Sequence, residues 1–226
     1  MNQTLKQRMG RGGPGVATAV LWALCSLAPW GRAAAEEPKV VHAPYAAQMC
    51  DSCHEMNGGN IGGLLAPQPE LCYQCHEAVD TGKVKHGALA IDSCTTCHHP
   101  HESAFPKLLK AAYPVKNYAE FKVENYALCF GCHDEKKILV KDATATTGFK
   151  DLAKKRNLHH LHVLREPSQY QRSCRFCHDP HSTGQEHLLR DKFPFGSSAV
   201  GLAYTPQVSG GSCAKTCHKE VGYVNR

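Results

Sequence analysis

The chain has 226 residues and is rich in cysteine and histidine, with 13 Cys and 15 His. Its formal net charge is +6, but four of the cations and none of the anions lie in residues 1–35. Residues 36–226 carry 22 cations against 20 anions, a balance that gives no support for nucleic-acid binding. The sequence contains no glycine-rich nucleotide loop and no Ser/His/Asp signal, which argues against nucleotide-dependent and serine-hydrolase chemistry.

Residues 1–35 have the layout of a secretory signal peptide. Basic residues precede an apolar run at 16–30, and Ala33-Ala34-Ala35 offers a cleavage site. The apolar run, which contains Cys25, is too short for a convincing membrane span, although an uncleaved N-terminal anchor is the alternative. The mature chain, residues 36–226, is therefore expected to be periplasmic or secreted to the cell surface.

Every cysteine after Cys25 belongs to a pair that is followed directly by histidine. Chance would give roughly 0.05 C-x-x-C-H matches in such a chain, and five are present. Neither a disulfide framework nor a zinc ribbon requires histidine after each pair, whereas C-x-x-C-H is the attachment signature of c-type haem. The motifs are motif 1 (Cys50, Cys53, His54), motif 2 (Cys72, Cys75, His76), motif 3 (Cys94, Cys97, His98), motif 4 (Cys129, Cys132, His133), motif 5 (Cys174, Cys177, His178) and motif 6 (Cys213, Cys217, His218).

The spacing explains the chemistry of each motif. On one helical turn, residues i, i+3 and i+4 share a face, so both thiols reach the haem vinyl groups and the histidine lies under the ring as the proximal iron ligand. Motif 6 has one extra residue between its cysteines and is a tolerated variant. The sequence thus predicts six covalently bound haem c groups.

Histidines outside the motifs recur with two offsets. One histidine stands eight residues before motif 1 and another eight residues before motif 3, an offset of 44. CHHPHES at residues 97–103 returns as CHDPHST at 177–183, an offset of 80. The histidines aligned by these repeats are His42 with His86, and His101 with His181.

This pattern resembles the doubled-CXXCH, cytochrome c3-like multihaem cytochromes c, whose units run C-x-x-C-H … His … C-x-x-C-H-x-P-H. The resemblance covers most of residues 41–190, with doubled units at about 71–110 and 128–190. It implies that each iron is ligated by the motif histidine and a second, distal histidine. The distal ligands carried over onto this chain are His42, His86, His101, His159, His162 and His181, whereas His99, His160 and His187 have no equivalent place in the pattern.

Only Met49 and Met56 remain after signal removal, and neither is well placed to cap its own haem. Bis-histidine ligation predicts potentials below those of Met/His cytochromes. The expected fold is mostly irregular with short α-helices, wrapped around six haems, with little or no sheet. Residues 149–164 are the best candidate for a longer helix, and NGGNIGG, LLAPQPE and KFPFGSS are expected to be loops.

These features predict an exported six-haem cytochrome that transfers electrons and is not an enzyme. Its expected partners are redox proteins, such as other cytochromes, an outer-membrane conduit or an extracellular acceptor. One alternative is a multihaem reductase of a nitrogen or sulfur oxyanion, which needs one open iron. Another is a homopolymer, an extracellular cytochrome filament in which His42 serves a neighbouring chain.

Overall fold

The computed structural model describes residues 39–145, 147–213 and 218–223. The predicted signal peptide and Cys217 of motif 6 lie outside the described residues. Residues 37–226 form one compact unit. Across the described part of the chain, no helix is both long and apolar enough to cross a membrane.

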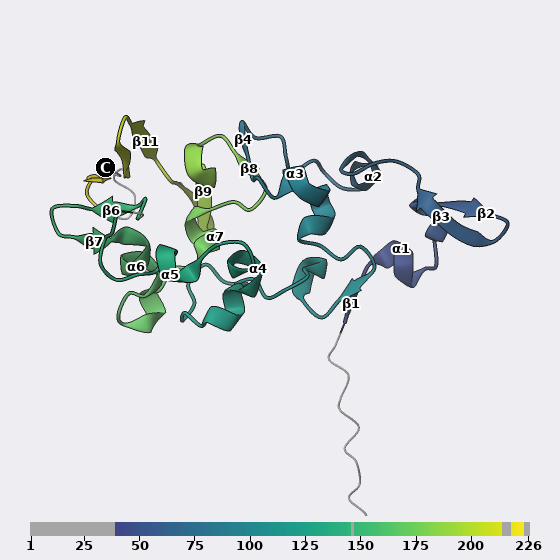
Figure 1. Ribbon diagram of the computed structural model, residues 1–226, viewed down its shortest axis with the longest axis horizontal. Helices are drawn as coiled ribbons and strands as arrows, with labels where there is room; N and C mark the ends of the chain where they lie inside the picture. The colour runs from purple at the N-terminus through teal and green to yellow at the C-terminus, as the bar shows by residue number, and fades with distance from the viewer. Residues whose placement is uncertain (1–38, 146, 214–217, 224–226) are drawn as a thin grey trace, which may run out of the picture. The chain divides into compact units, whose positions relative to one another are not determined.

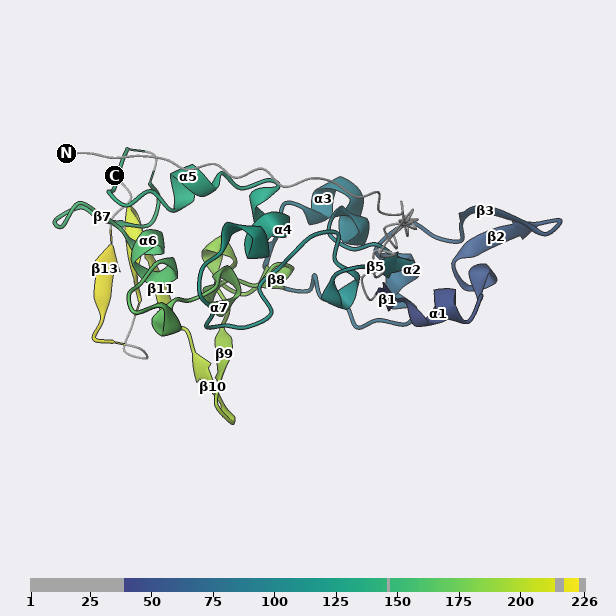
Figure 2. The same cartoon turned by 90° about the horizontal axis from the view of Figure 1, so that it is seen from below.

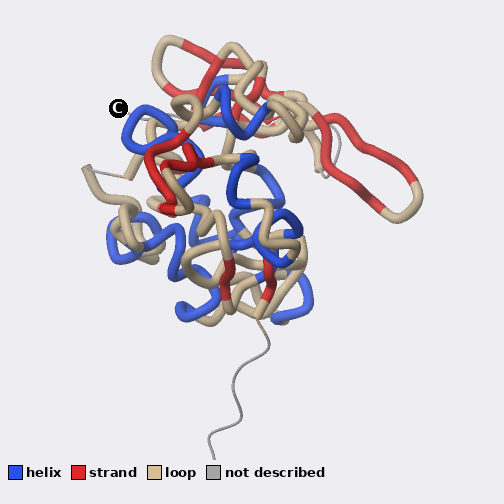
Figure 3. Tube along the Cα trace, turned by 90° about the vertical axis from the view of Figure 1, so that its right-hand side faces the viewer, coloured by secondary structure: helices blue, strands red, loops and turns tan. Residues whose placement is uncertain are grey.

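The α-helices of the described residues are single turns, apart from α6 with six residues (Figures 1 and 3). Such short helices are not stable alone and depend on tertiary contacts. They are α1 (Ala43–Ala46), α2 (Glu70–Tyr73), α3 (Leu89–Asp92), α4 (Ala127–Phe130), α5 (Glu135–Ile138), α6 (Leu158–Val163) and α7 (Cys174–Cys177). The 3₁₀ turns are η1 (Cys50–Ser52), η2 (Ser93–Thr96), η3 (Pro106–Leu108), η4 (Val123–Tyr126), η5 (Ser168–Tyr170) and η6 (Glu186–Leu188).

Small antiparallel sheets accompany these helices, which corrects the expectation of little or no sheet. The β2–β3 turn holds Gly58 and Gly59 at positive φ, and the β9–β10 turn holds Gly196, so two predicted loops close as hairpins. The pairs are β1 (Val40–Val41) with β5 (Glu102–Ser103), β2 (His54–Asn57) with β3 (Asn60–Leu64), β4 (Val84–Lys85) with β8 (Ser182–Thr183), β6 (Lys150–Asp151) with β7 (Arg156–Asn157), β9 (Lys192–Phe195) with β10 (Ser198–Gly201), and β11 (Tyr204–Gln207) with β12 (Gly210–Cys213), which also pairs with β13 (Val221–Tyr223).

The two sequence repeats form the same structural unit twice. Strands β1 and β5 pair as β4 and β8 do, and the offsets of 44 and 80 convert one pair into the other. Beside the first pair, His42 N–H donates to the His101 carbonyl at 2.8 Å. Beside the second, His86 N–H donates to the His181 carbonyl at 2.9 Å. Each unit therefore places two histidines from distant segments next to one another.

The side-chain core is small for a chain of this length. Phe176 and Phe193 pack with their ring centroids 4.5 Å apart, and Tyr126 packs against Phe121 and Phe130. Many large apolar residues are instead exposed to the interior of a cavity. The buried hydrophobic residues of the described chain are Leu71, Tyr126, Leu139, Leu158, Val163, Phe176, Phe193 and Tyr223.

The predicted helix over 149–164 is wrong in its first half. Residues 150–157 form the β6–β7 hairpin, with Lys155 at φ +50° in its turn, and α6 begins only at Leu158. The cause is Asn157, whose side chain accepts from His159 N–H at 2.9 Å and caps the helix. The amide group of Asn157 also donates to the carbonyls of Ile138 (2.6 Å) and Val140 (2.8 Å).

We expect Asn157→Ala to destabilise the holoprotein by about 1–3 kcal/mol, because Asn157 is 1% exposed and two part-buried carbonyls would lose their donors. Chemical denaturation followed by the Soret band and by near-ultraviolet circular dichroism measures this change. The exposed Asn125→Ala is the matched control and should change stability by less than about 0.5 kcal/mol. Equal midpoints for the two variants would contradict the role assigned to Asn157.

Candidate functional site

The first cysteine of each of motifs 1 to 5 lies on a single helical turn, whereas Cys213 of motif 6 ends β12. Motifs 2, 4 and 5 lie on α2, α4 and α7, whereas motifs 1 and 3 begin on η1 and η2. In motifs 2 to 5 the histidine N–H donates to the carbonyl of the first cysteine at 2.9–3.0 Å, which is an i to i+4 bond. The first cysteine and the histidine therefore stand on one side of the turn in each of these motifs.

Five motif histidines face a histidine from another part of the chain. The ring centroids of these pairs are 5.9–6.3 Å apart, and the rings are tilted by 10–36°. In every case the second ring belongs to the set of distal ligands expected from the sequence. The pairs are His54 with His101, His76 with His42, His98 with His181, His133 with His86, and His178 with His159.

This spacing also suits two imidazoles on one metal ion. A histidine nitrogen binds a metal at about 2 Å, so two rings on opposite sides of one ion have centres about 6 Å apart. The two histidines of four of these pairs lie far apart in sequence. Closeness along the chain therefore does not explain why their rings face each other. The arrangement provides two axial nitrogen ligands at each position.

The motif 6 histidine has a weaker link to the expected set. Burial lowers the pKa of His162, and the charges of Arg172 and His218 add to this effect. His162 lies on α6 three residues after His159. Since Cys217 is outside the described residues, the geometry of motif 6 is described only at Cys213 and His218.

Backbone carbonyls fix the orientation of several rings. Nδ1 of His98 lies 2.9 Å from the Lys107 carbonyl, and Nδ1 of His178 lies 2.9 Å from the His187 carbonyl. Nδ1 of His162 likewise lies 2.7 Å from the Leu158 carbonyl. A carbonyl only accepts, so each Nδ1 carries the proton and Nε2 keeps its lone pair for a metal.

Sequence reasoning missed these carbonyls. Lys107 and His187 lie 80 residues apart at equivalent places in η3 and η6, and both have positive φ, 60° and 57°. The signal was the repeat of LLK at 108–110 as LLR at 188–190, which marks the same turn in both units. Only the backbone conformation shows that the turn aims a carbonyl at the motif histidine.

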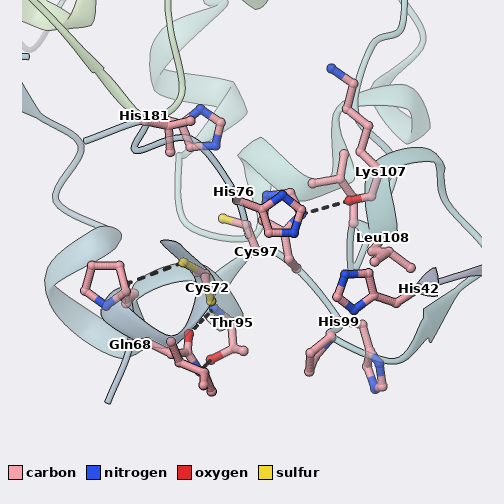
Figure 4. A pocket seen from close by; sticks show the side chains of 18 of the residues that line it. His42, Gln68, Cys72, His76, Thr95, Cys97, His99, Lys107, Leu108 and His181 are labelled. Atoms are coloured by element: carbon pink, nitrogen blue, oxygen red, sulfur yellow. Dashed lines mark hydrogen bonds between the residues drawn. The ribbon is translucent and has the colours of Figure 1, made fainter. Parts of the chain in front are cut away.

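A cavity of about 1990 Å³ lies where motifs 1, 2 and 3 meet (Figure 4). Its lining contains all six cysteines of these motifs and both members of three histidine pairs. Tyr45, Met49, Ile61 and Leu64 also line the cavity and would be covered by a large apolar group. The cavity thus supplies thiols, facing imidazoles and an apolar wall together.

Cysteines of consecutive motifs come close together at two points. The cysteines of motifs 1 to 4 are thiols rather than disulfides. Burial raises the pKa of Cys72 to about 11, and the Cys94 thiol, with which it hydrogen-bonds, adds to this. A hydrogen bond to Cys129 raises the pKa of the Cys174 thiol. Motif 2 therefore touches motif 3, and motif 4 touches motif 5.

The three histidines outside the expected ligand set have other contacts. His99 makes an edge contact with His101 at 6.1 Å and faces no motif histidine. Nδ1 of His160 is 2.9 Å from the Leu139 carbonyl, which ties α6 to the end of α5. The ring of His187 lies edge-on to Tyr204 at 6.1 Å.

Burial favours the neutral form of four of the facing rings, which is the form that binds a metal. Burial lowers the pKa of His159 to about 4, and the facing His178 adds to this shift. Burial also lowers the pKa values of His86, His98 and His178. With the pairs of thiols at fixed spacing, these residues fit covalently attached haem with two axial histidines, so the class of protein is a c-type cytochrome.

Residues 42–81 and 86–138 match the family model described as the doubled CXXCH motif, which covers motifs 1 to 4. This part of the chain therefore carries the doubled CXXCH motif of multihaem c-type cytochromes, and members of that family generally transfer electrons. Searches of curated proteins and of solved structures found no match.

We expect His101→Ala and His181→Ala each to convert one haem to a five-coordinate, high-spin form, because each removes one ring of a facing pair. Electron paramagnetic resonance of the oxidised protein measures the change. The controls are His99→Ala and His187→Asn, the latter because Asn tolerates the positive φ at this position. A high-spin signal in a control but not in His181→Ala would overturn the pairing.

Proposed function

We propose that the chain binds six haem c groups, each between two histidines, and transfers electrons along them. The observation that carries the proposal is the set of facing histidine pairs, in which five of the six motif histidines meet a second ring at metal-ligand spacing. For the sixth motif the proposed second ligand of His218 is His162, which lies on α6 three residues after His159. When bound, haem supplies an iron that gains or loses one electron.

The side chains of the protein have three roles in this proposal. The cysteine pairs fix each haem covalently, and the facing histidines occupy both axial positions. Carbonyls on Nδ1, such as those of Lys107 and His187, orient the rings and make them stronger donors. No methionine takes part in a facing pair, so low reduction potentials follow.

Contacts between motifs support close spacing of the haems in the order of the chain. The distal ligands of motifs 1 and 2 are joined by the hydrogen bond from His42 to His101, and those of motifs 3 and 4 by the bond from His86 to His181. The distal ligands of motifs 5 and 6 share α6. Cys72 beside Cys94 and Cys129 beside Cys174 link these three pairs into one continuous series.

The same contacts favour a carrier over the two alternatives. A reductase needs an iron with an open sixth position, and five of the six motif histidines here face a second histidine. A filament built on His42 needs that ring to serve another chain, yet His42 faces His76 of its own chain at 5.9 Å. We therefore propose a monomeric relay.

The proposed setting is the periplasm or the cell surface. The signal-peptide layout of residues 1–35 supports export. The proposed partners are other redox proteins, including an outer-membrane conduit or an extracellular acceptor, and no nucleic acid. The direction of electron flow depends on the potentials of those partners.

Mass spectrometry of the mature protein should show six covalently bound haems, because every cysteine of residues 36–226 belongs to a motif. A thiol assay under denaturing conditions provides the complementary measurement and should find no reactive cysteine. Two reactive thiols at Cys213 and Cys217 would reduce the number to five and would place the defect in the motif with the extra residue.

The oxidised protein should be entirely low-spin, and the reduced protein should not bind carbon monoxide, because both axial positions are filled at each iron. Electron paramagnetic resonance and carbon monoxide difference spectra measure these properties. His181→Ala serves as a positive control, since it opens one site. Rapid carbon monoxide binding by the wild type, at about one haem per chain, would favour the reductase.

A further inference from the structure

The structure joins two clusters of basic residues that are separate in sequence. Lys136 and Lys137 lie on α5, and the hairpin of β6 and β7 carries the second cluster (Figure 1). Backbone hydrogen bonds connect the segments, from Ala143 N–H to the Lys155 carbonyl at 3.1 Å and from Asn157 N–H to the Lys141 carbonyl at 3.3 Å. The resulting basic face consists of Lys136, Lys137, Lys141, Lys154, Lys155 and Arg156.

The basic side chains of this face point to solvent. The side chains of Lys137 and Lys154 are 70% and 67% exposed even though each forms an ion pair. Asp134 pairs with Lys137, and Asp151 pairs with Lys154 and Arg156. Within the described residues, three exposed lysines of the face have no carboxylate at ion-pair distance, namely Lys136, Lys141 and Lys155.

The charge of this face differs from that of the rest of the mature chain. Residues 134–157 contain seven cations and four anions, a net charge of +3, whereas residues 36–226 as a whole carry only +2. The remainder is therefore slightly negative, and the propionates of bound haems make it more so. A local positive field on a negative protein orients an approaching anionic surface toward one place.

The basic face is attached to the helix that carries two of the expected distal ligands. Asn157 ends the hairpin and caps α6. Its side chain also donates to the carbonyl of Ile138, the last residue of α5, and to that of Val140. His160 of α6 also contacts the Leu139 carbonyl. In Figures 1 and 2, α5, α6, β6 and β7 lie together at one end of the described chain. His159 and His162 therefore lie on the helix into which the basic hairpin leads.

We propose that the basic face is the docking surface for an acidic redox protein, which exchanges electrons at motifs 5 and 6. This rests on the proposed function. One electron leaves the partner's donor group and is taken up at one of these two sites, or moves in the opposite direction, and no bond forms or breaks. Charges at the rim of such an interface mainly set the association rate and its salt dependence, which suits a transient redox encounter.

The test compares two variants of the full-length holoprotein with the same change in net charge. The first replaces three lysines of the basic face, Lys136→Glu/Lys141→Glu/Lys155→Glu. The control replaces three exposed lysines elsewhere, Lys83→Glu/Lys122→Glu/Lys192→Glu. Binding to immobilised flavodoxin, an acidic flavin protein, is measured by surface plasmon resonance at low and at high salt.

We expect the first variant to bind flavodoxin about tenfold more weakly at low salt and to lose most of the salt dependence, while the control changes by less than about threefold. Electron transfer from reduced flavodoxin should slow in parallel, and reduction by a small neutral reductant should stay unchanged. The corresponding Lys→Gln variant should show an intermediate loss and replaces the Glu variant if that one folds poorly.

Other outcomes would overturn the docking surface. Equal weakening in both triple variants would indicate a general charge effect. Unchanged binding together with shifted reduction potentials or lost haem would show that these lysines pair with propionates. Failure of the proposed function is distinguishable, because a holoprotein that the small neutral reductant cannot reduce would fail as an electron carrier whichever surface binds flavodoxin.

Discussion

The rest of this structure depends on one constraint, which is that histidine rings from distant segments must face each other in pairs. Each ring of a pair must stand about 6 Å from its partner, with Nδ1 hydrogen-bonded so that Nε2 is free. Meeting this condition repeatedly within so short a chain leaves little room for long helices or wide sheets. The single-turn helices and two-residue strands position side chains, and the apolar walls of the cavity take the place of a conventional core.

The chain meets this constraint in two structural ways. The first is the short antiparallel pair, β1 with β5 and β4 with β8, which places His42 beside His101 and His86 beside His181. The second is α6, where His159 and His162 lie three residues apart on one helix turn. Motifs 5 and 6 therefore need no further strand pair. Asn157, which caps α6, has no counterpart in the repeats.

Local spacing made the motifs and the candidate ligands predictable, because C-x-x-C-H acts within one helical turn and the two offsets align the outer histidines. The partner of each ring was not predictable, since nothing near His98 in sequence indicates that His181 will face it. The helix expected over 149–164 failed for a similar reason. Its apolar spacing was outweighed by the buried hydrogen bonds of Asn157, which depend on carbonyls 17 and 19 residues away.

The direction of the chain gives these pairs an order of assembly. For motifs 2, 4 and 5 the partner histidine precedes the motif, so a chain emerging from its N-terminus already carries that ring when the motif appears. Motifs 1 and 3 instead pair with His101 and His181, which follow motif 3 and motif 5. These two sites would hold a single histidine until a later motif arrives. Premature release of a truncated chain would therefore leave an open, reactive iron at motif 1 or motif 3.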